Sequence, residues 1–270
     1  MKYILLQITF LLLLAELFAG GAELRFEYQA DFGYQSIIVN GQVVRVKPVH
    51  NEEQYLKYAA IHDVLKRIDH PLKLLDLGAC SGFFALKAAE DFPTSHSVMI
   101  DLLDRTTDIC VANTDRNNIT YLQKRFALQD FDELSRREHF DVVLILNVIH
   151  HCGGEWLPMF NALKKMSSYV IIDIPPPEDL VRGSNCATMI HHMQTKENSK
   201  LLGRFKRGDP RQLSYLFLVK GDLDGKPGDL GIKGSTFFHF NGQFPKAEFV
   251  REKYGNGDNF SLVGVKALLH

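Results

Sequence analysis

A regular alternation of short apolar runs and helical stretches between residues 73 and 174 constrains the fold of this chain more than any other feature. The apolar runs are Lys73–Leu77, Ser97–Asp101, Ile119–Arg125, Phe140–Asn147 and Tyr169–Ile174. The helical stretches between them are Phe83–Glu90, Thr107–Asn113, Phe131–Arg137 and Trp156–Met166. Strands that are apolar throughout are typical of a parallel sheet covered on both faces. The pattern therefore predicts an α/β fold with a doubly wound, mostly parallel sheet.

The rest of the chain adds segments at both ends of this fold. The chain has 270 residues, of which 46% are apolar and 23% charged, as in an ordinary globular protein. We interpret residues 1–22 as a signal peptide or hydrophobic leader, 23–51 as an N-terminal β-hairpin extension, and 52–270 as the α/β domain. The domain begins with a helix over Asn51–Asp69 and ends in an irregular C-terminal extension. In that extension we expect a helix over Ser184–Leu202, a strand over Leu213–Lys220 and short antiparallel strands that add to the sheet edge.

The first 22 residues have the pattern of an export signal. Lys2 precedes a mostly apolar run, Ile4–Leu14, and small residues follow at 19–22. The run is shorter than the roughly 20 apolar residues of a membrane-spanning helix. Asn40-Gly41 between two apolar runs is the strongest short signal for a hairpin. The leader predicts a secreted protein, or one associated with the membrane through residues 4–18.

Charge and cysteine content exclude several classes of function. Lys and Arg number 31 against 32 Asp and Glu, a net charge of −1, so the chain has no global basic field for holding duplex nucleic acid. The cysteines are Cys80, Cys110, Cys152 and Cys186. None forms a CxxC pair, so neither a zinc ribbon nor a thioredoxin-type site is indicated. We predict no metal site.

A glycine-containing turn after the first apolar strand predicts a ligand site. Gly78 and Gly82 in Leu77-Gly78-Ala79-Cys80-Ser81-Gly82 allow a sharp turn and a close approach of the backbone to a ligand. In a doubly wound sheet this turn faces the crevice at the carboxyl ends of the strands. The turn lacks the middle glycine of the dinucleotide fingerprint and the Gly-Lys-Ser/Thr of a P-loop. An adenosyl group without pyrophosphate fits better, and Asp76 at the strand end can hold an ammonium group.

With these residues the sequence resembles the class I S-adenosylmethionine-dependent methyltransferases over about residues 52–175. Their D-x-G-x-G-x-G motif stands here as residues 76–82, with Cys80 in place of the middle glycine. The resemblance implies S-adenosylmethionine as cofactor, Asp101 (with Asp104 as a rival) on the ribose hydroxyls, and Asp130 on the adenine amino group. Residues 140–143 match the family's F-D-x-V strand start. A nicotinamide enzyme is the weaker alternative for this fold.

The end of the fourth apolar strand carries the candidate catalytic residues. Asn147-Val148-Ile149-His150-His151 resembles the N-V-x-H-H of small-molecule methyltransferases, which implies that Asn147 lies beside the methionine part of the cofactor. His150 or His151 would then remove a proton from an O–H or N–H acceptor. The pair His191-His192 and the single His239 are alternatives. Asp173 with Asn147 is too small a set to indicate a metal-dependent enzyme.

Three functional hypotheses follow. The first is a methyltransferase acting on an O or N atom of a small-molecule or glycan- or lipid-linked acceptor. The second is an inactive methyltransferase-fold binding module in an exported or membrane-associated context, since S-adenosylmethionine is made in the cytosol. The third, an RNA methyltransferase, rests on the basic stretch Lys196–Arg211, which otherwise forms a solvated helix face. Cofactor supply favours the cytoplasm, whereas the leader favours export.

Overall fold

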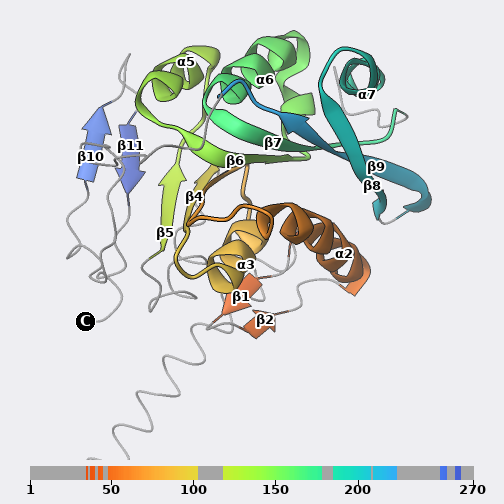
Figure 1. Cartoon of the computed structure of the whole chain (residues 1–270), viewed down its shortest axis with the longest axis horizontal. Helices are drawn as coiled ribbons and strands as arrows, with labels where there is room; N and C mark the ends of the chain where they lie inside the picture. The colour runs from red at the N-terminus through yellow and green to blue at the C-terminus, as the bar shows by residue number, and fades with distance from the viewer. Residues whose placement is uncertain are drawn as a thin grey trace, which may run out of the picture.

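The computed structural model describes most of the predicted α/β region (Figure 1). The residues that it describes are 35, 37–39, 42–44, 48–102, 118–177, 185–207, 209–223, 250–253 and 259–262. The predicted leader at 1–22, the predicted helix Thr107–Asn113, Asp104, Cys110 and His239 lie outside the described residues. Within the described residues, no helix is both long enough and apolar enough to cross a membrane.

One nine-stranded sheet forms the centre of the molecule, in the order β10-β11-β5-β4-β3-β6-β7-β9-β8. Its strands are β3 (Lys73–Leu77), β4 (His96–Asp101), β5 (Ile119–Gln123), β6 (Phe140–Leu146), β7 (Ser167–Ile174), β8 (Ser199–Arg207), β9 (Asp209–Lys220), β10 (Val250–Lys253) and β11 (Asn259–Leu262). The five strands from β5 to β7 are parallel, and antiparallel strands extend both edges. This confirms the predicted doubly wound, mostly parallel sheet.

The connection order places the topological switch point of the sheet, where such folds have their binding crevice, at the carboxyl end of β3. The chain moves from β3 outward through β4 to β5, and then crosses back to β6 on the other side of β3. Such a reversal of direction is where doubly wound sheets bind ligands, outside the carboxyl ends of the strands. The loops that follow β3, β4 and β6 therefore meet at one edge.

Helices cover both faces of the sheet, as Figure 1 shows. The helices are α2 (Pro48–Leu65), α3 (Phe83–Asp91), α5 (Leu128–Arg137), the 3-10 helix η1 (Ile149–Glu155), α6 (Trp156–Lys165) and α7 (Cys186–Thr195). Helices α5, α6 and α7 pack on one face with alternate strand residues such as Val143 and Ile145. Helices α2 and α3 pack on the other face with Val142 and Leu144. Apolar side chains therefore line both faces of each central strand, which explains the unbroken apolar runs in the sequence.

The predicted hairpin is present, whereas one predicted helix is too long. Strands β1 (Ile37–Val39) and β2 (Gln42–Val44) pair antiparallel around Asn40-Gly41. The helix predicted over Ser184–Leu202 is wrong beyond Thr195, because α7 ends there and β8 begins at Ser199.

Pairing with β9 explains why the segment after Thr195 is a strand and not a helix. Strand β8 pairs antiparallel with β9, which itself lies beside β7. Ser199 Oγ donates to the carbonyl of Met193 at 2.5 Å and closes the turn between α7 and β8. The predicted strand Leu213–Lys220 is confirmed as part of β9, and β10 and β11 confirm the antiparallel strands expected near the C-terminus. The basic stretch after residue 196 therefore lies mainly on an edge strand and not on a helix.

Candidate active site

The turn after β3 requires glycine at its first position. Gly78 has a φ of 70°, and a Cβ built there would lie 2.2 Å from Val148 Cγ2. The backbone N–H groups of Gly78 and Ala79 both donate to the carbonyl of Ile100, at 2.7 and 3.1 Å. The turn is therefore joined to the end of β4 and in contact with the loop after β6, as a binding turn at the crevice must be.

The turn continues through two further residues with positive φ. Cys80 has a φ of 54° and Gly82 a φ of 79°. A Cβ at Gly82 would lie 2.8 Å from Met99 Sδ, so a larger residue there would have to displace that side chain as well as adopt a positive φ. The left-handed conformation is unfavourable for a cysteine, and Cys80 holds it where the family motif has glycine.

Asp101, the candidate for binding the ribose hydroxyls, lies against this turn. Its Oδ2 accepts a hydrogen bond from the backbone N–H of Cys80 at 2.7 Å. Asp101 is the last residue of β4, and its carboxylate is therefore held beside the glycine turn. This is the strongest geometric link between two of the predicted cofactor-binding positions.

Asp76 lies within β3, two residues before Gly78, and its side chain is buried. It is 1% exposed, and its Oδ2 has no hydrogen-bond partner among the described residues. Burial, and then the charge of Asp101, raise the pKa of Asp76 to about 7, although the backbone N–H of Ala85 lowers it in part. A buried carboxyl with an unsatisfied oxygen is suited to binding a cationic group at the crevice.

Asn147 follows β6 directly, in a strained conformation that two hydrogen bonds hold in place. Its φ is 58°, which asparagine adopts more readily than most other residues do. Its backbone N–H donates to the carbonyl of Asp173 at 3.1 Å, and its Nδ2 donates to Asp173 Oδ2 at 2.5 Å. The next residue, Val148, touches Gly78. Asn147 therefore lies at the same edge as the glycine turn.

Asp130 has structural partners where the resemblance implied an adenine contact. Its Oδ2 accepts a hydrogen bond from Ala127 N–H at 2.7 Å, and its Oδ1 is 2.9 Å from Lys124 Nζ. These contacts stabilise the start of α5. The backbone N–H of Lys124 donates to the carbonyl of Asp101 at 2.8 Å. Through Lys124, Asp130 is therefore linked to the end of β4, where Asp101, the candidate for binding the ribose, lies.

The two candidate catalytic histidines lie in η1, directly after β6. His150 is 3% exposed, His151 is exposed, and their ring centroids are 3.9 Å apart. The neighbouring Cys152 has its thiol pKa raised by burial and then by the charge of Glu155, which makes it a poor nucleophile. Because His151 is exposed and His150 is buried, the ring of His151 is the one that can exchange a proton with bulk water.

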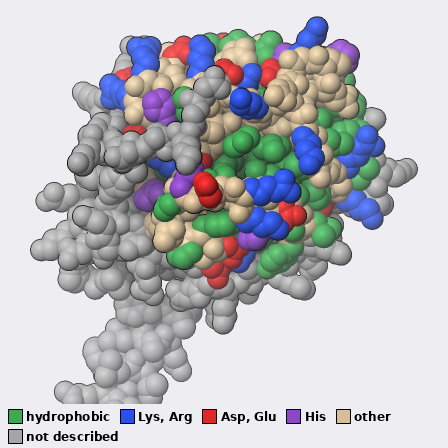
Figure 2. All heavy atoms as spheres, viewed as in Figure 1, with side chains coloured by type: hydrophobic (Ala, Val, Ile, Leu, Met, Phe, Trp, Pro, Cys, Tyr) green, Lys and Arg blue, Asp and Glu red, His purple; other side chains and the backbone are tan. Residues whose placement is uncertain are grey.

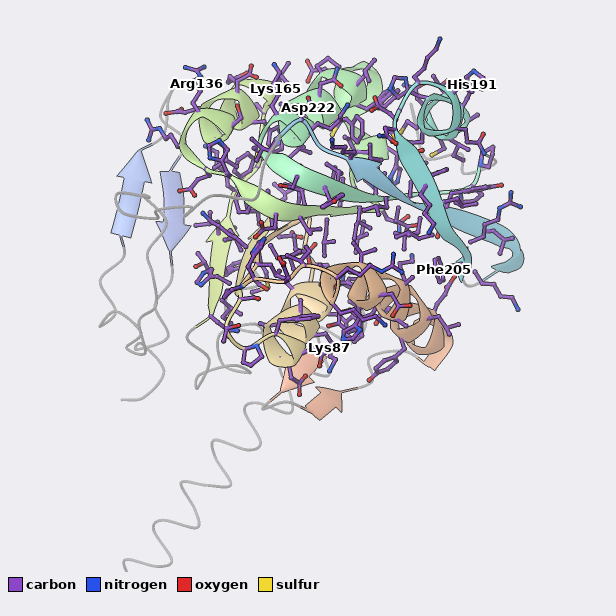
Figure 3. The ribbon with its side chains drawn as sticks, viewed as in Figure 1. Lys87, Arg136, Lys165, His191, Phe205 and Asp222 are labelled. Atoms are coloured by element: carbon purple, nitrogen blue, oxygen red, sulfur yellow. The ribbon has the colours of Figure 1, made fainter. Side chains whose placement is uncertain are left out.

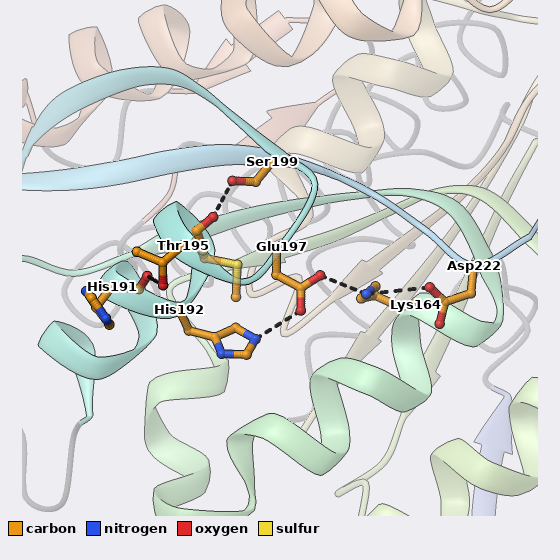
Figure 4. A network of polar contacts seen from close by, with 8 residues as sticks. Lys164, His191, His192, Thr195, Glu197, Ser199 and Asp222 are labelled. Atoms are coloured by element: carbon orange, nitrogen blue, oxygen red, sulfur yellow. Dashed lines mark hydrogen bonds and ion pairs between the residues drawn. The ribbon is translucent and has the colours of Figure 1, made fainter.

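The alternative histidines of α7 belong to another network (Figure 4). His192 Nε2 is 2.9 Å from Glu197 Oε1, and Glu197 Oε2 is 2.7 Å from Lys164 Nζ. Lys164 lies near the end of α6, just before β7, so this network is at the amino end of β7, away from the crevice. His191 is exposed on α7 and points away from the sheet (Figure 3). Neither histidine is placed to act at the glycine turn.

Two residues at the site were not identified from the sequence. Gln35 Oε1 accepts the backbone N–H of Phe83, the first residue of α3, at 3.2 Å. Lys57 of α2 forms a buried ion pair with Asp173 at 2.6 Å. A signal for Lys57 existed, because it shares the apolar face of the helix with Ile61 and Leu65 at helical spacing. A lysine on an apolar helix face implies a buried partner.

Comparisons with known proteins agree with this geometry. A family model described as a methyltransferase domain matches residues 74–169. A structure of WbdD with a kinase inhibitor is 19% identical and has a TM-score of 0.50, over 63% of this chain and 40% of that chain. This chain therefore spans less than half of the WbdD chain that it matches. No curated protein sequence matches this chain.

Two further solved structures are similar to this chain at slightly lower TM-scores. Magnesium protoporphyrin IX methyltransferase from Synechocystis PCC 6803, with SAH bound, is 13% identical with a TM-score of 0.47, over 63% of this chain and 83% of that chain. The methyltransferase domain of bacterial CtHen1 is 16% identical with a TM-score of 0.47, over 62% and 99% respectively. The family-model match over residues 74–169, the strand order and the glycine turn together indicate that this part of the chain has the class I, Rossmann-like fold of a methyltransferase domain.

Proposed function

We propose that this protein binds S-adenosylmethionine at the turn after β3 and transfers its methyl group to an O or N atom of a small-molecule or glycan- or lipid-linked acceptor. The observation that carries the proposal is the hydrogen bond between Cys80 N–H and Asp101, beside a Gly78 that has no room for a side chain. The cofactor supplies a methyl group on a positively charged sulfur.

The residues of the crevice have distinct parts in this proposal. Asp101 accepts the ribose hydroxyls, and Gly78 and Gly82 let the backbone approach the nucleoside. Asp76 faces the cationic end of the cofactor with its unsatisfied oxygen. Asn147 lies beside the methionine part, because Val148 contacts Gly78. The protein contributes mainly position, because methyl transfer needs the acceptor atom in line with the sulfonium carbon.

Proton removal from the acceptor is assigned to the histidines of η1. His151 is exposed and its ring centroid lies 3.9 Å from that of His150, so a proton taken from the acceptor can pass to solvent through His151. The reaction converts an O–H or N–H acceptor into its methyl derivative and releases one proton, which the imidazole takes up.

An inactive binding module is the second candidate, and Cys80 is the observation that favours it. Its left-handed conformation and its side chain replace a glycine at the turn. An apparent export signal, residues 1–22, is consistent with that alternative because the cofactor is made in the cytosol.

Calorimetric titration of the full chain with S-adenosylmethionine and S-adenosylhomocysteine tests the proposal. We expect both to bind the wild type and Asp101→Ala to bind them at least about tenfold more weakly. Asp69→Ala removes an exposed carboxylate that follows α2 and serves as the matched control. If the folded wild type binds neither ligand, the proposal of an enzyme is rejected and the inactive binding module is the remaining candidate.

A further inference from the structure

A buried lysine–carboxylate pair lies at the carboxyl end of β7. Lys57 Nζ is 2.6 Å from Asp173 Oδ2, and the Asp173 side chain has no solvent exposure. Ser214 Oγ of β9 is 3.5 Å from the same ammonium group, and the ring centroid of Phe205 is 5.7 Å from it. Figure 3 shows Phe205 of β8 where β8 comes close to α2. Four elements of the fold therefore converge on one ammonium group.

Two acceptor oxygens beside this pair lack donors. Asp173 Oδ2 accepts hydrogen bonds from both Lys57 and Asn147 Nδ2. Asp173 Oδ1 and Asn147 Oδ1 are buried, and neither has a hydrogen-bond partner among the residues that the structure describes. A buried acceptor without a donor is unfavourable, and native proteins rarely leave one unless a ligand or water completes it. These two oxygens therefore indicate a bound donor.

The two oxygens lie beside the proposed methyl donor. Leu146 and Asp173 are paired in register across β6 and β7, and Asn147 follows directly. Val148 then contacts Gly78 of the turn. A molecule bound to these oxygens would thus lie at the same sheet edge as the cofactor and close in sequence to the histidines of η1.

The charge of the pair selects the chemistry of the donor. Lys57 already neutralises Asp173, so a second cation at Asp173 Oδ1 would meet the ammonium charge. Among the described residues, no group of three or more His, Cys, Asp or Glu could hold a metal ion. A neutral O–H donor meets neither obstacle, and it can bind both a carboxylate and an amide oxygen.

We propose that Asp173 Oδ1 and Asn147 Oδ1 accept hydrogen bonds from hydroxyl groups of the methyl acceptor, which is then a polyhydroxylated molecule such as a sugar or polyol. The inference rests on the proposed function. Lys57 is a positioning residue: it orients Asp173 and cancels its charge. Buried acceptors of this kind discriminate strongly against analogues without the hydroxyl, because the acceptors are then left unpaired.

Three ligands on one ring skeleton test this assignment: cis-cyclohexane-1,2-diol, cyclohexanol and cyclohexylamine. Their binding to the full chain is measured by ligand-observed NMR with saturating S-adenosylhomocysteine. We expect the diol to bind wild type most tightly, and to bind Lys57→Met/Asp173→Leu at least about tenfold more weakly. The double variant replaces the ion pair with apolar groups, which a fold tolerates better than one unpaired charge. The control is Lys73→Met/Glu138→Leu, at the buried ion pair beside the amino end of β3.

The single variant Lys57→Gln gives a readout that a merely structural role would not change. Glutamine keeps an N–H donor for Asp173 but leaves its charge uncompensated, so we expect cyclohexylamine to bind more tightly than the diol. Any one of three results would overturn the assignment. Wild type could bind cyclohexylamine most tightly, or Lys57→Gln could still prefer the diol over cyclohexylamine. The double variant could also bind the diol as tightly as wild type does. S-adenosylhomocysteine that fails to bind wild type rejects the proposed function instead, and diol titration without it still tests the oxygen pair.

Discussion

The buried carboxyl of Asp76 makes the stability of the cofactor-free protein depend on pH. Burial and the charge of Asp101 raise the pKa of Asp76 to about 7, whereas the unfolded chain releases this proton near 3.8. Between these values the native state binds one more proton than the unfolded state. This group therefore makes the free energy of unfolding fall as the pH rises from about 4 to about 7, and the effect levels off above that.

The variant Asp76→Asn removes this dependence. At 1.36 kcal/mol per pKa unit, ionised Asp76 costs the native state about 4 kcal/mol above pH 7. Asparagine has nearly the same shape, keeps an oxygen for the Ala85 N–H and cannot ionise. We expect the free energy of unfolding of the variant, relative to wild type, to rise by about 3 kcal/mol between pH 5 and pH 8.

Urea unfolding at pH 5, 6, 7 and 8, followed by circular dichroism, measures this difference by linear extrapolation. Asp63→Asn is the control, because Asp63 is exposed and its hydrogen bond with Lys66 lowers its pKa. Its stabilising effect is fully present above the unfolded pKa, so Asp63→Asn should lower the free energy of unfolding by a similar small amount at all four pH values. Parallel pH profiles of wild type and Asp76→Asn over this range would refute the assignment of a raised pKa.

Three further predictions concern the turn and the α7 network. Gly78→Ala places a Cβ 2.2 Å from Val148 at a positive φ, so we expect the free energy of unfolding in urea to fall by about 2–4 kcal/mol. Its control is Gly154→Ala, which has open space around the new Cβ and should change stability by less than about 0.5 kcal/mol. Cys80→Gly relieves a φ of 54° and should stabilise the fold by about 1 kcal/mol; a loss of stability would contradict the strain. Glu197→Gln weakens its pairs with Lys164 and His192 and should lower the melting temperature, and any change in S-adenosylhomocysteine affinity would place the network in the site.

The central fold could be predicted because burial on both faces leaves a direct mark on sequence. Phe140–Leu146 is buried at every position, and the sequence shows it as an unbroken apolar run. The glycine turn could be found for a similar reason. Both Gly78 and Gly82 have positive φ and close neighbours, two conditions that few residues other than glycine satisfy.

Features that depend on distant partners could not be predicted. The segment Ser199–Leu202 reads as a continuation of helix α7, but its backbone pairs with β9. Lys57 and Asp173 are 116 residues apart, and no local pattern joins them. The carboxylate of Asp130 has local partners instead, Lys124 and Ala127, and its contact with the adenine stays a prediction. Sequence spacing can identify candidate site residues, but the partners that their side chains contact depend on the tertiary structure.

The carboxylates of the crevice divide it into two regions of different charge. Lys57 neutralises Asp173 on the β7 side, whereas on the β3 side Asp76 lies close enough to Asp101 for their charges to repel. A cationic cofactor on the β3 side would relieve that repulsion and favour the ionised form of Asp76. At pH 7, near its pKa, binding should then release about half a proton per site. Calorimetric titrations with S-adenosylmethionine in buffers of different ionisation enthalpy measure this release, and it should vanish in Asp76→Asn. Binding without proton release in wild type would show that the cationic group of the ligand does not reach Asp76.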